Sequence, residues 1–292
     1  MSRTCLAAAA AALCLVVRAE AGQPEDPFPP KGDYTESVHR FFPDLDARLN
    51  AVRYGRWRAL EIAWTSGIDT ASDREFSSYF LDLVRRPPRF EPEASRVAPR
   101  FAREAIPLFR ALRWGQVFEA QVLDILASPD STPRLAEQRT TRLLAIYRRE
   151  SCALLTSPTD APLSSPAITA APASARMLLA GTRLFALAAE DLAASGFGQQ
   201  RWRVKKTLEA YDFAPSVEVP VETSTYKVSA PTMESRFPQI ADQLDRIAWM
   251  RRELFGALVS RPDSPEGRRE RDGRVRELAR RWGLATEKIG GR

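Results

Sequence analysis

The stretch that most constrains the fold is residues 103–127, REAIPLFRALRWGQVFEAQVLDILA, which carries a dense apolar pattern at helical spacing. At 100° per residue its large apolar side chains fall on one broad arc, while Arg103, Arg110 and Asp124 fall on the opposite side. An arc this wide requires burial against more than one neighbouring element. The stretch therefore predicts a long helix at the centre of a helical fold.

Other segments repeat apolar residues at the same spacing and carry helix boundary signals, such as Thr-Pro, Ser-Pro and a Ser-x-x-Glu capping box. They predict helices at about 43–64, 72–86, 132–150, 174–195, 199–213, 238–259 and 264–282. Only residues 217–229 read as extended, and Pro220 limits them to a sheet edge or a lone hairpin. We therefore expect an all-α, irregular helical bundle of about seven to eight helices with at most one minor β hairpin. No segment recurs at a fixed period, so we do not expect a solenoid.

The N-terminus has the layout of a secretory signal peptide. Arg3 precedes an apolar core at 5–17, which is too short to span a membrane, and Ala19-Glu20-Ala21 places small residues where a signal peptidase cleaves. Residues 1–21 are predicted to be removed, which indicates an exported protein in the periplasm or outside the cell. An uncleaved anchor or an organelle transit peptide would share this pattern.

Shifts in composition divide the rest of the chain, and the densest run of prolines gives the best domain boundary. The expected parts are a Pro-rich leader at 22–42, a helical region at 43–155, a Pro/Ser/Ala-rich linker or loop at 156–173 and a second helical region at 174–292.

Scarce cysteine and histidine exclude several kinds of site. Cys5 and Cys14 would leave with the signal peptide, so Cys152 has no partner for a disulfide within the mature chain. His39 is the only histidine, which excludes metal sites built from several histidines. The chain also lacks phosphate-binding and dinucleotide-binding glycine motifs. We expect no metal and no cofactor.

Four charged residues lie where their helices should present apolar side chains: Arg56, Glu119, Arg139 and Arg251. If the arginines converge, they would form a positively charged site for an anionic ligand, because guanidinium groups match carboxylate, phosphate or sulfate. Alternatively, each arginine stem packs in the core while its head reaches solvent or a carboxylate. Glu119 would act as a general acid or anchor a polar pocket, or else form a buried ion pair.

These patterns favour an exported, non-enzymatic protein that binds a partner protein or an anionic small molecule. The alternative is a carboxylate-dependent hydrolase acting on envelope or extracellular glycans, with Glu119 as its acid. The net charge is +6, but an export signal argues against nucleic acid. The Arg-rich run at 268–281 would allow peripheral contact with a membrane, although acidic residues interrupt it and are typical of a solvated helix face.

Overall fold

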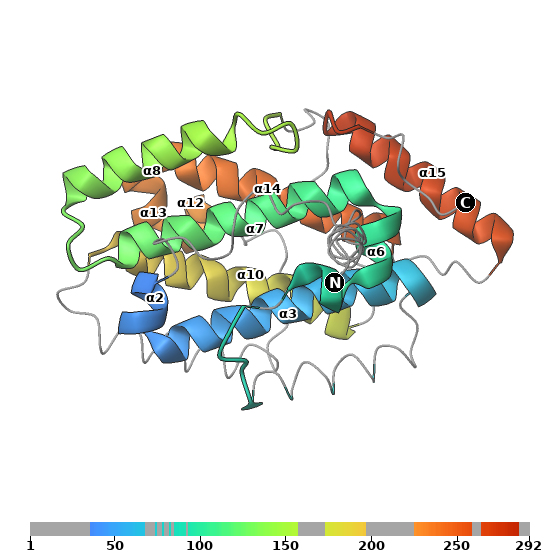
Figure 1. Cartoon of the computed structure of the whole chain (residues 1–292), viewed down its shortest axis with the longest axis horizontal. Coiled ribbons are helices and arrows are strands. Elements are labelled where there is room, and N and C mark those ends of the chain that lie inside the picture. The colour runs from blue at the N-terminus through green and yellow to red at the C-terminus, as the bar shows by residue number, and fades with distance from the viewer. Residues whose placement is uncertain are drawn as a thin grey trace, which may run out of the picture. The chain divides into compact units, whose positions relative to one another are not determined.

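The computed structural model describes residues 36–67, 85–91, 93–156, 173–196, 225–258 and 264–285, together with the isolated residues 74, 78 and 82. Every element in these ranges is a helix, which confirms the all-α prediction for this part of the chain (Figure 1). The helices are α2 (Glu36–Phe41), α3 (Pro43–Ser66), α5 (Ala94–Val97), α6 (Pro99–Glu104), α7 (Ile106–Ala127), α8 (Pro133–Tyr147), α10 (Ala173–Ala194), α12 (Tyr226–Ser229), α13 (Pro231–Arg236), α14 (Pro238–Leu258) and α15 (Pro265–Arg281).

One prediction of local structure needs correction. Residues 226–229 form the short helix α12, so the extended prediction is wrong for that end of 217–229. Helix α2 occupies the end of the segment expected as the leader at 22–42. The signal peptide at 1–21, most of the helix at 72–86, the linker residues 157–172, the helix at 199–213 and residues 217–224 lie outside the described residues.

Among the described helices, four long ones form the core. Helices α3 and α7 each pack against both α10 and α14, so the two helical regions expected from the sequence share one core. Gly115 of α7 permits a close crossing, because a Cβ atom there would lie 2.7 Å from Cγ2 of Ile247 in α14. Helix α8 covers α7, and α15 packs against α14 (Figure 1). Within the described ranges, no helix combines the length and the apolar character needed to cross a membrane.

The long helices recur at similar intervals. They begin at residues 43, 106, 173 and 238, which lie 63, 67 and 65 residues apart. Three of them follow a six-residue helix through a single non-helical residue: Phe42, Ala105 or Phe237. These residues have φ between −128° and −137° and ψ between 45° and 56°. These spacings are unequal, so no repeat of fixed period is present, but a helical unit of variable length recurs along the described part of the chain.

The recurring units are tied together by three carboxylates at one equivalent position. Glu61, Asp124 and Asp191 each lie eighteen residues after the first residue of their long helix, at 43, 106 and 173. Each accepts backbone N–H groups from the short helix of another unit, and those donors have no partner within their own helix. The bonds run from Arg100 and Phe101 to Glu61 at 3.0–3.1 Å, from Val38 to Asp124 at 2.9 Å, and from Thr232 and Met233 to Asp191 at 2.6 and 2.9 Å.

Candidate functional site

Three of the four charged residues singled out from the sequence meet in the core. Nη1 of Arg56 lies 3.3 Å from both carboxylate oxygens of Glu119, and Nη2 of Arg251 lies 3.9 Å from Oε2 of Glu119. The three side chains come from α3, α7 and α14, and all three residues are buried. Arg139 is exposed on α8 and does not belong to this group. The sequence pattern thus located a real cluster of charges, but not all of its members.

The two arginines of this cluster differ in how their donors are used. Arg56 also donates to the hydroxyl of Thr182 at 3.5 Å and to the carbonyl of Thr182 at 3.3 Å, which links α3 to α10. Arg251 makes no hydrogen bond to any described residue, and its contact with Glu119 is too long to be one. No nitrogen atom of Arg251 is among the fully buried side-chain atoms that lack a partner in the described ranges, so these donors keep some access to solvent.

Glu119 is an anion in the folded protein. Burial alone would raise the pKa of its carboxyl group, but the guanidinium groups of Arg56 and Arg251 outweigh burial and hold that pKa at about 2. A carboxyl group with this pKa has no proton to give at neutral pH. Glu119 is also enclosed by its partners, so this geometry does not support a role as general acid.

A second group of polar contacts continues from the cluster through α10, α12 and α14. Arg183 pairs with Asp245 at 2.5 Å, and its guanidinium lies 4.7 Å from the centre of the Tyr226 ring. The backbone N–H of Tyr226 points to the same Asp245 carboxylate at 3.5 Å, and the Tyr226 hydroxyl donates to Oε2 of Glu190. The short helix α12 is thereby fixed against the centre of the bundle.

Glu190 and Glu119 have opposite protonation states at neutral pH: Glu190 is mostly protonated, whereas Glu119 is ionised. Burial, and after it the negative charge of Glu119, raises the pKa of Glu190 to about 8, so this carboxyl group is mostly neutral at pH 7. Two carboxyl groups with pKa values pushed apart are typical of acid–base pairs in enzymes. Both are almost fully buried here, however, and a glycan chain would need an open cleft to reach them.

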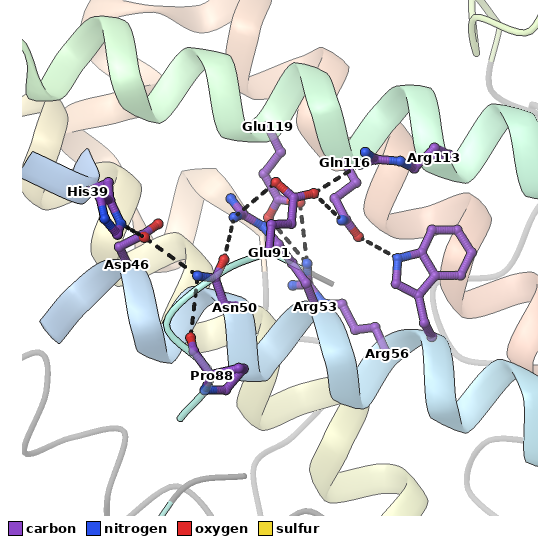
Figure 2. Close-up of polar contacts among 11 residues, drawn as sticks. His39, Asp46, Asn50, Arg53, Arg56, Pro88, Glu91, Arg113, Gln116 and Glu119 are labelled. Atoms are coloured by element: carbon purple, nitrogen blue, oxygen red, sulfur yellow. Dashed lines mark hydrogen bonds and ion pairs between the residues drawn. The ribbon is translucent and has the colours of Figure 1, made fainter. Parts of the chain in front are cut away.

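Glu91 forms a third group of polar contacts, between α3 and α7 (Figure 2). Its carboxylate accepts hydrogen bonds from Arg113 at 2.9 Å and Gln116 at 2.8 Å, and it lies 3.6 Å from Nη1 of Arg53. Burial would raise the pKa of Glu91, but the charges of Arg53 and Arg113 lower it. The irregular segment that carries Glu91 is thus anchored to two of the core helices.

Sequence reasoning missed Arg183, Glu190 and Glu91. Glu91 lies among prolines, where no periodicity indicates burial. Glu190 stands next to Asp191, and only the helix phase distinguishes the buried acid from its half-exposed neighbour. The signal that would have found Arg183 and Glu190 is the recurring unit, since both lie on the face of α10 that corresponds to the buried faces of α3, α7 and α14.

The arginines at 268–281 are less available for contact with a membrane than the composition of this segment indicates. Arg271 is buried: its guanidinium lies 3.9 Å from the centre of the Trp64 ring and donates to the Trp64 carbonyl and to Asp272. Arg274 and Arg280 pair with Glu270 and Glu277 on their own helix. Much of the positive charge of α15 is therefore engaged in holding this helix or is neutralised on its surface.

Other kinds of site find little support in the described ranges. No three His, Cys, Asp or Glu residues there are arranged to hold a metal ion. A small apolar pocket lies beside Val38, Leu123 and Leu192, but it offers no polar side chain to orient a ligand. Comparison with known proteins gives no further guide, since no protein-family model, no curated protein and no solved structure matches this chain.

Proposed function

We propose that this protein is an exported, non-enzymatic binding protein whose central arginines take up a small anionic ligand. The observation that carries the proposal is the state of Arg251, which is buried yet makes no hydrogen bond within the described part of the chain. A carboxylate or other oxyanion would accept hydrogen bonds from its free N–H groups. Export rests on the signal-like N-terminus, and the ligand would then be met outside the cytoplasm.

The charge balance around Arg251 supports an anion. Burial and the nearby Arg56 guanidinium lower the pKa of Arg251 to about 9, which means that its positive charge is poorly compensated. Bringing a negative charge close to a buried guanidinium would stabilise the charged form. Within the cluster of three, the Arg251 side chain also has the largest exposed fraction, 10% against 5% for Arg56 and 7% for Glu119.

The experiment is a thermal-shift and calorimetric titration of the mature chain with sodium acetate, chloride, phosphate and sulfate at constant ionic strength. At least one of these anions should raise the melting temperature in a saturable way, because a ligand that binds only the folded state stabilises it. Arg251→Gln should weaken binding about tenfold or more, since a hydrogen bond to a charged group contributes about 1.5–3 kcal/mol. Arg142→Gln, which removes an exposed arginine from α8, should leave binding unchanged.

A partner protein is the second candidate, and one surface favours it. Phe90 is 69% exposed, stacks on His39 at 5.9 Å between ring centres, and has the guanidinium of Arg89 against its ring. Exposed aromatic and arginine side chains are enriched at the energetic centres of protein interfaces. A photo-crosslinking amino acid at position 90 should then capture one defined envelope protein, whereas the same group at position 142 should not. Equal labelling from both positions would count against this surface.

A further inference from the structure

The charged residues at the centre of the bundle occupy one repeated position. Arg56, Glu119 and Arg251 each lie thirteen residues after the first residue of their long helix, at 43, 106 and 238. In the remaining long helix, α10, the corresponding residue counted from 173 is Ala186. Three of the four equivalent positions are thus charged, and the fourth carries only a methyl group.

The packing of α10 indicates that Ala186 faces the same centre. Arg183 precedes it by three residues and Glu190 follows it by four, which places all three on one face of the helix. Both Arg183 and Glu190 interact electrostatically with Glu119 and with Arg251. Ala186 itself is completely buried. Ala186 therefore shares a helix face with two groups that interact with the charged cluster.

The four equivalent positions form two pairs that differ in charge. Arg56 of α3 has Glu119 of α7 as its partner, at 3.3 Å, whereas the equivalent position available to Arg251 from α10 is the uncharged Ala186. Arg251 therefore shares Glu119 from 3.9 Å. Around this centre, the guanidinium groups of Arg56, Arg183 and Arg251 face the carboxylates of Glu119 and Asp245, because Glu190 is mostly protonated. Arg53 also acts on Glu119, but its own ion pair is with Glu91. Among these described groups, one positive charge remains in excess.

We infer that the anionic group of the ligand binds between Arg251 and Ala186, where it replaces the fourth charged side chain of the repeated position. This assignment rests on the proposed function and narrows it to a ligand that presents one monovalent anionic group of carboxylate size. Arg251 supplies the hydrogen bonds, and the buried excess charge makes a single negative charge favourable. A doubly charged anion would reverse the imbalance instead of removing it, so acetate or chloride should bind better than sulfate.

The test introduces a negative charge at residue 186 by mutation. Ala186→Glu should occupy the site with its own carboxylate, and Ala186→Gln is its isosteric, uncharged control. In buffer without the probe anions, Ala186→Glu should melt at a higher temperature than Ala186→Gln. It should also lose the response to sodium acetate that the wild-type chain shows. Because both substitutions add the same volume at the same position, the difference between them reports the charge and not the fit.

Three outcomes would contradict these ideas, and they can be told apart. If Ala186→Glu is no more stable than Ala186→Gln, the inference is overturned whether or not the wild-type chain binds anions. If Ala186→Glu still responds to acetate as the wild type does, the anion binds elsewhere, and only the inference fails. If no probe anion affects the wild-type chain, the proposed function fails. Should both variants at 186 not fold, Arg251→Gln decides, since an unchanged affinity for acetate would exclude this site.

Discussion

Glu61 of α3 caps the short helix that precedes α7, and Asp124 of α7 caps the short helix that precedes α3. Glu61 near the end of α3 accepts the backbone N–H groups of Arg100 and Phe101 ahead of α7, and Asp124 near the end of α7 accepts that of Val38 ahead of α3. The relationship is reciprocal although the partners are far apart in sequence. A carboxylate at a helix N-terminus satisfies free donors and interacts favourably with the helix dipole.

Removing the Glu61 carboxylate should therefore destabilise α6, and removing the Asp124 carboxylate should destabilise α2. Glu61→Ala and Asp124→Ala are each expected to lower the free energy of unfolding by about 1–2 kcal/mol. Amide exchange should become faster at the N-terminus of α6 in the first variant and in α2 in the second. Glu137→Ala, an exposed change on α8, should stay within about 0.5 kcal/mol. Faster exchange within α3 itself after Glu61→Ala would contradict the cross-unit account.

The crossing of α7 and α14 depends on a missing side chain. Gly115→Ala would improve helix propensity by about 1 kcal/mol, yet its Cβ would lie 2.7 Å from Ile247. We expect net destabilisation of about 1–3 kcal/mol from overpacking, measured by chemical denaturation. In a double-mutant cycle, Ile247→Ala should relieve much of that cost, whereas the distant change Val275→Ala should not. Additive effects in the first pair would show that the two residues do not clash.

Breaking the central ion pair should be costly. Glu119→Gln leaves Arg56 and Arg251 without their shared anion, and the loss of one partner of a buried pair typically costs about 3–5 kcal/mol. The wild-type carboxylate has a folded pKa of about 2 against 4.5 in the unfolded chain, so its stabilisation is complete above pH 4.5 and disappears as pH falls toward 2. The difference in unfolding free energy between wild type and Glu119→Gln should shrink over that interval. A constant difference would contradict the pairing.

Glu190 should give the opposite pH dependence. Its folded pKa of about 8 exceeds the unfolded value of 4.5, so the unfolded chain ionises first and stability falls as pH rises from 4.5 to 8. The groups that act on it are Glu119, Arg183, Arg56 and Tyr226. Glu190→Gln keeps an acceptor for the Tyr226 hydroxyl and removes the titration. Its stability should exceed that of the wild type increasingly above pH 5, by up to about 5 kcal/mol at pH 8. Parallel denaturation profiles for the two proteins would refute this.

The sequence predicted the fold class well because helix boundaries in this chain carry strong local signals. Thr132 and Ser264 each precede a proline, and both side chains cap the N–H group three residues later, as their positions predict. Residues 226–229 misled the prediction, because the aromatic side chain of Tyr226 is buried in the core and α12 packs against α10 and α14. Local propensity is a weak guide where tertiary contacts decide the conformation.

The site was predictable in part. Arg56, Glu119 and Arg251 stood out because a charge on an apolar face conflicts with helix periodicity. The same reasoning selected Arg139, because periodicity identifies one face of a helix but not whether a neighbouring element covers that face. Helix α8 lies at the outside of the bundle, and Arg139 is exposed there. Ala186 gave no local signal at all. Its importance comes only from the alignment of four helices, which no single window of sequence contains.

The long reach of these contacts has a consequence for the order in which the structure forms. Val38 bonds to Asp124 across 86 residues, Arg56 reaches Thr182 across 126, and Arg271 reaches Trp64 across 207. A chain emerging from the ribosome therefore cannot complete the surroundings of α3 until Arg271 of α15 has been made. Contacts this distant slow folding, because each requires a large loop to close first. We therefore expect the surroundings of α3 to be completed late, when α15 packs against them.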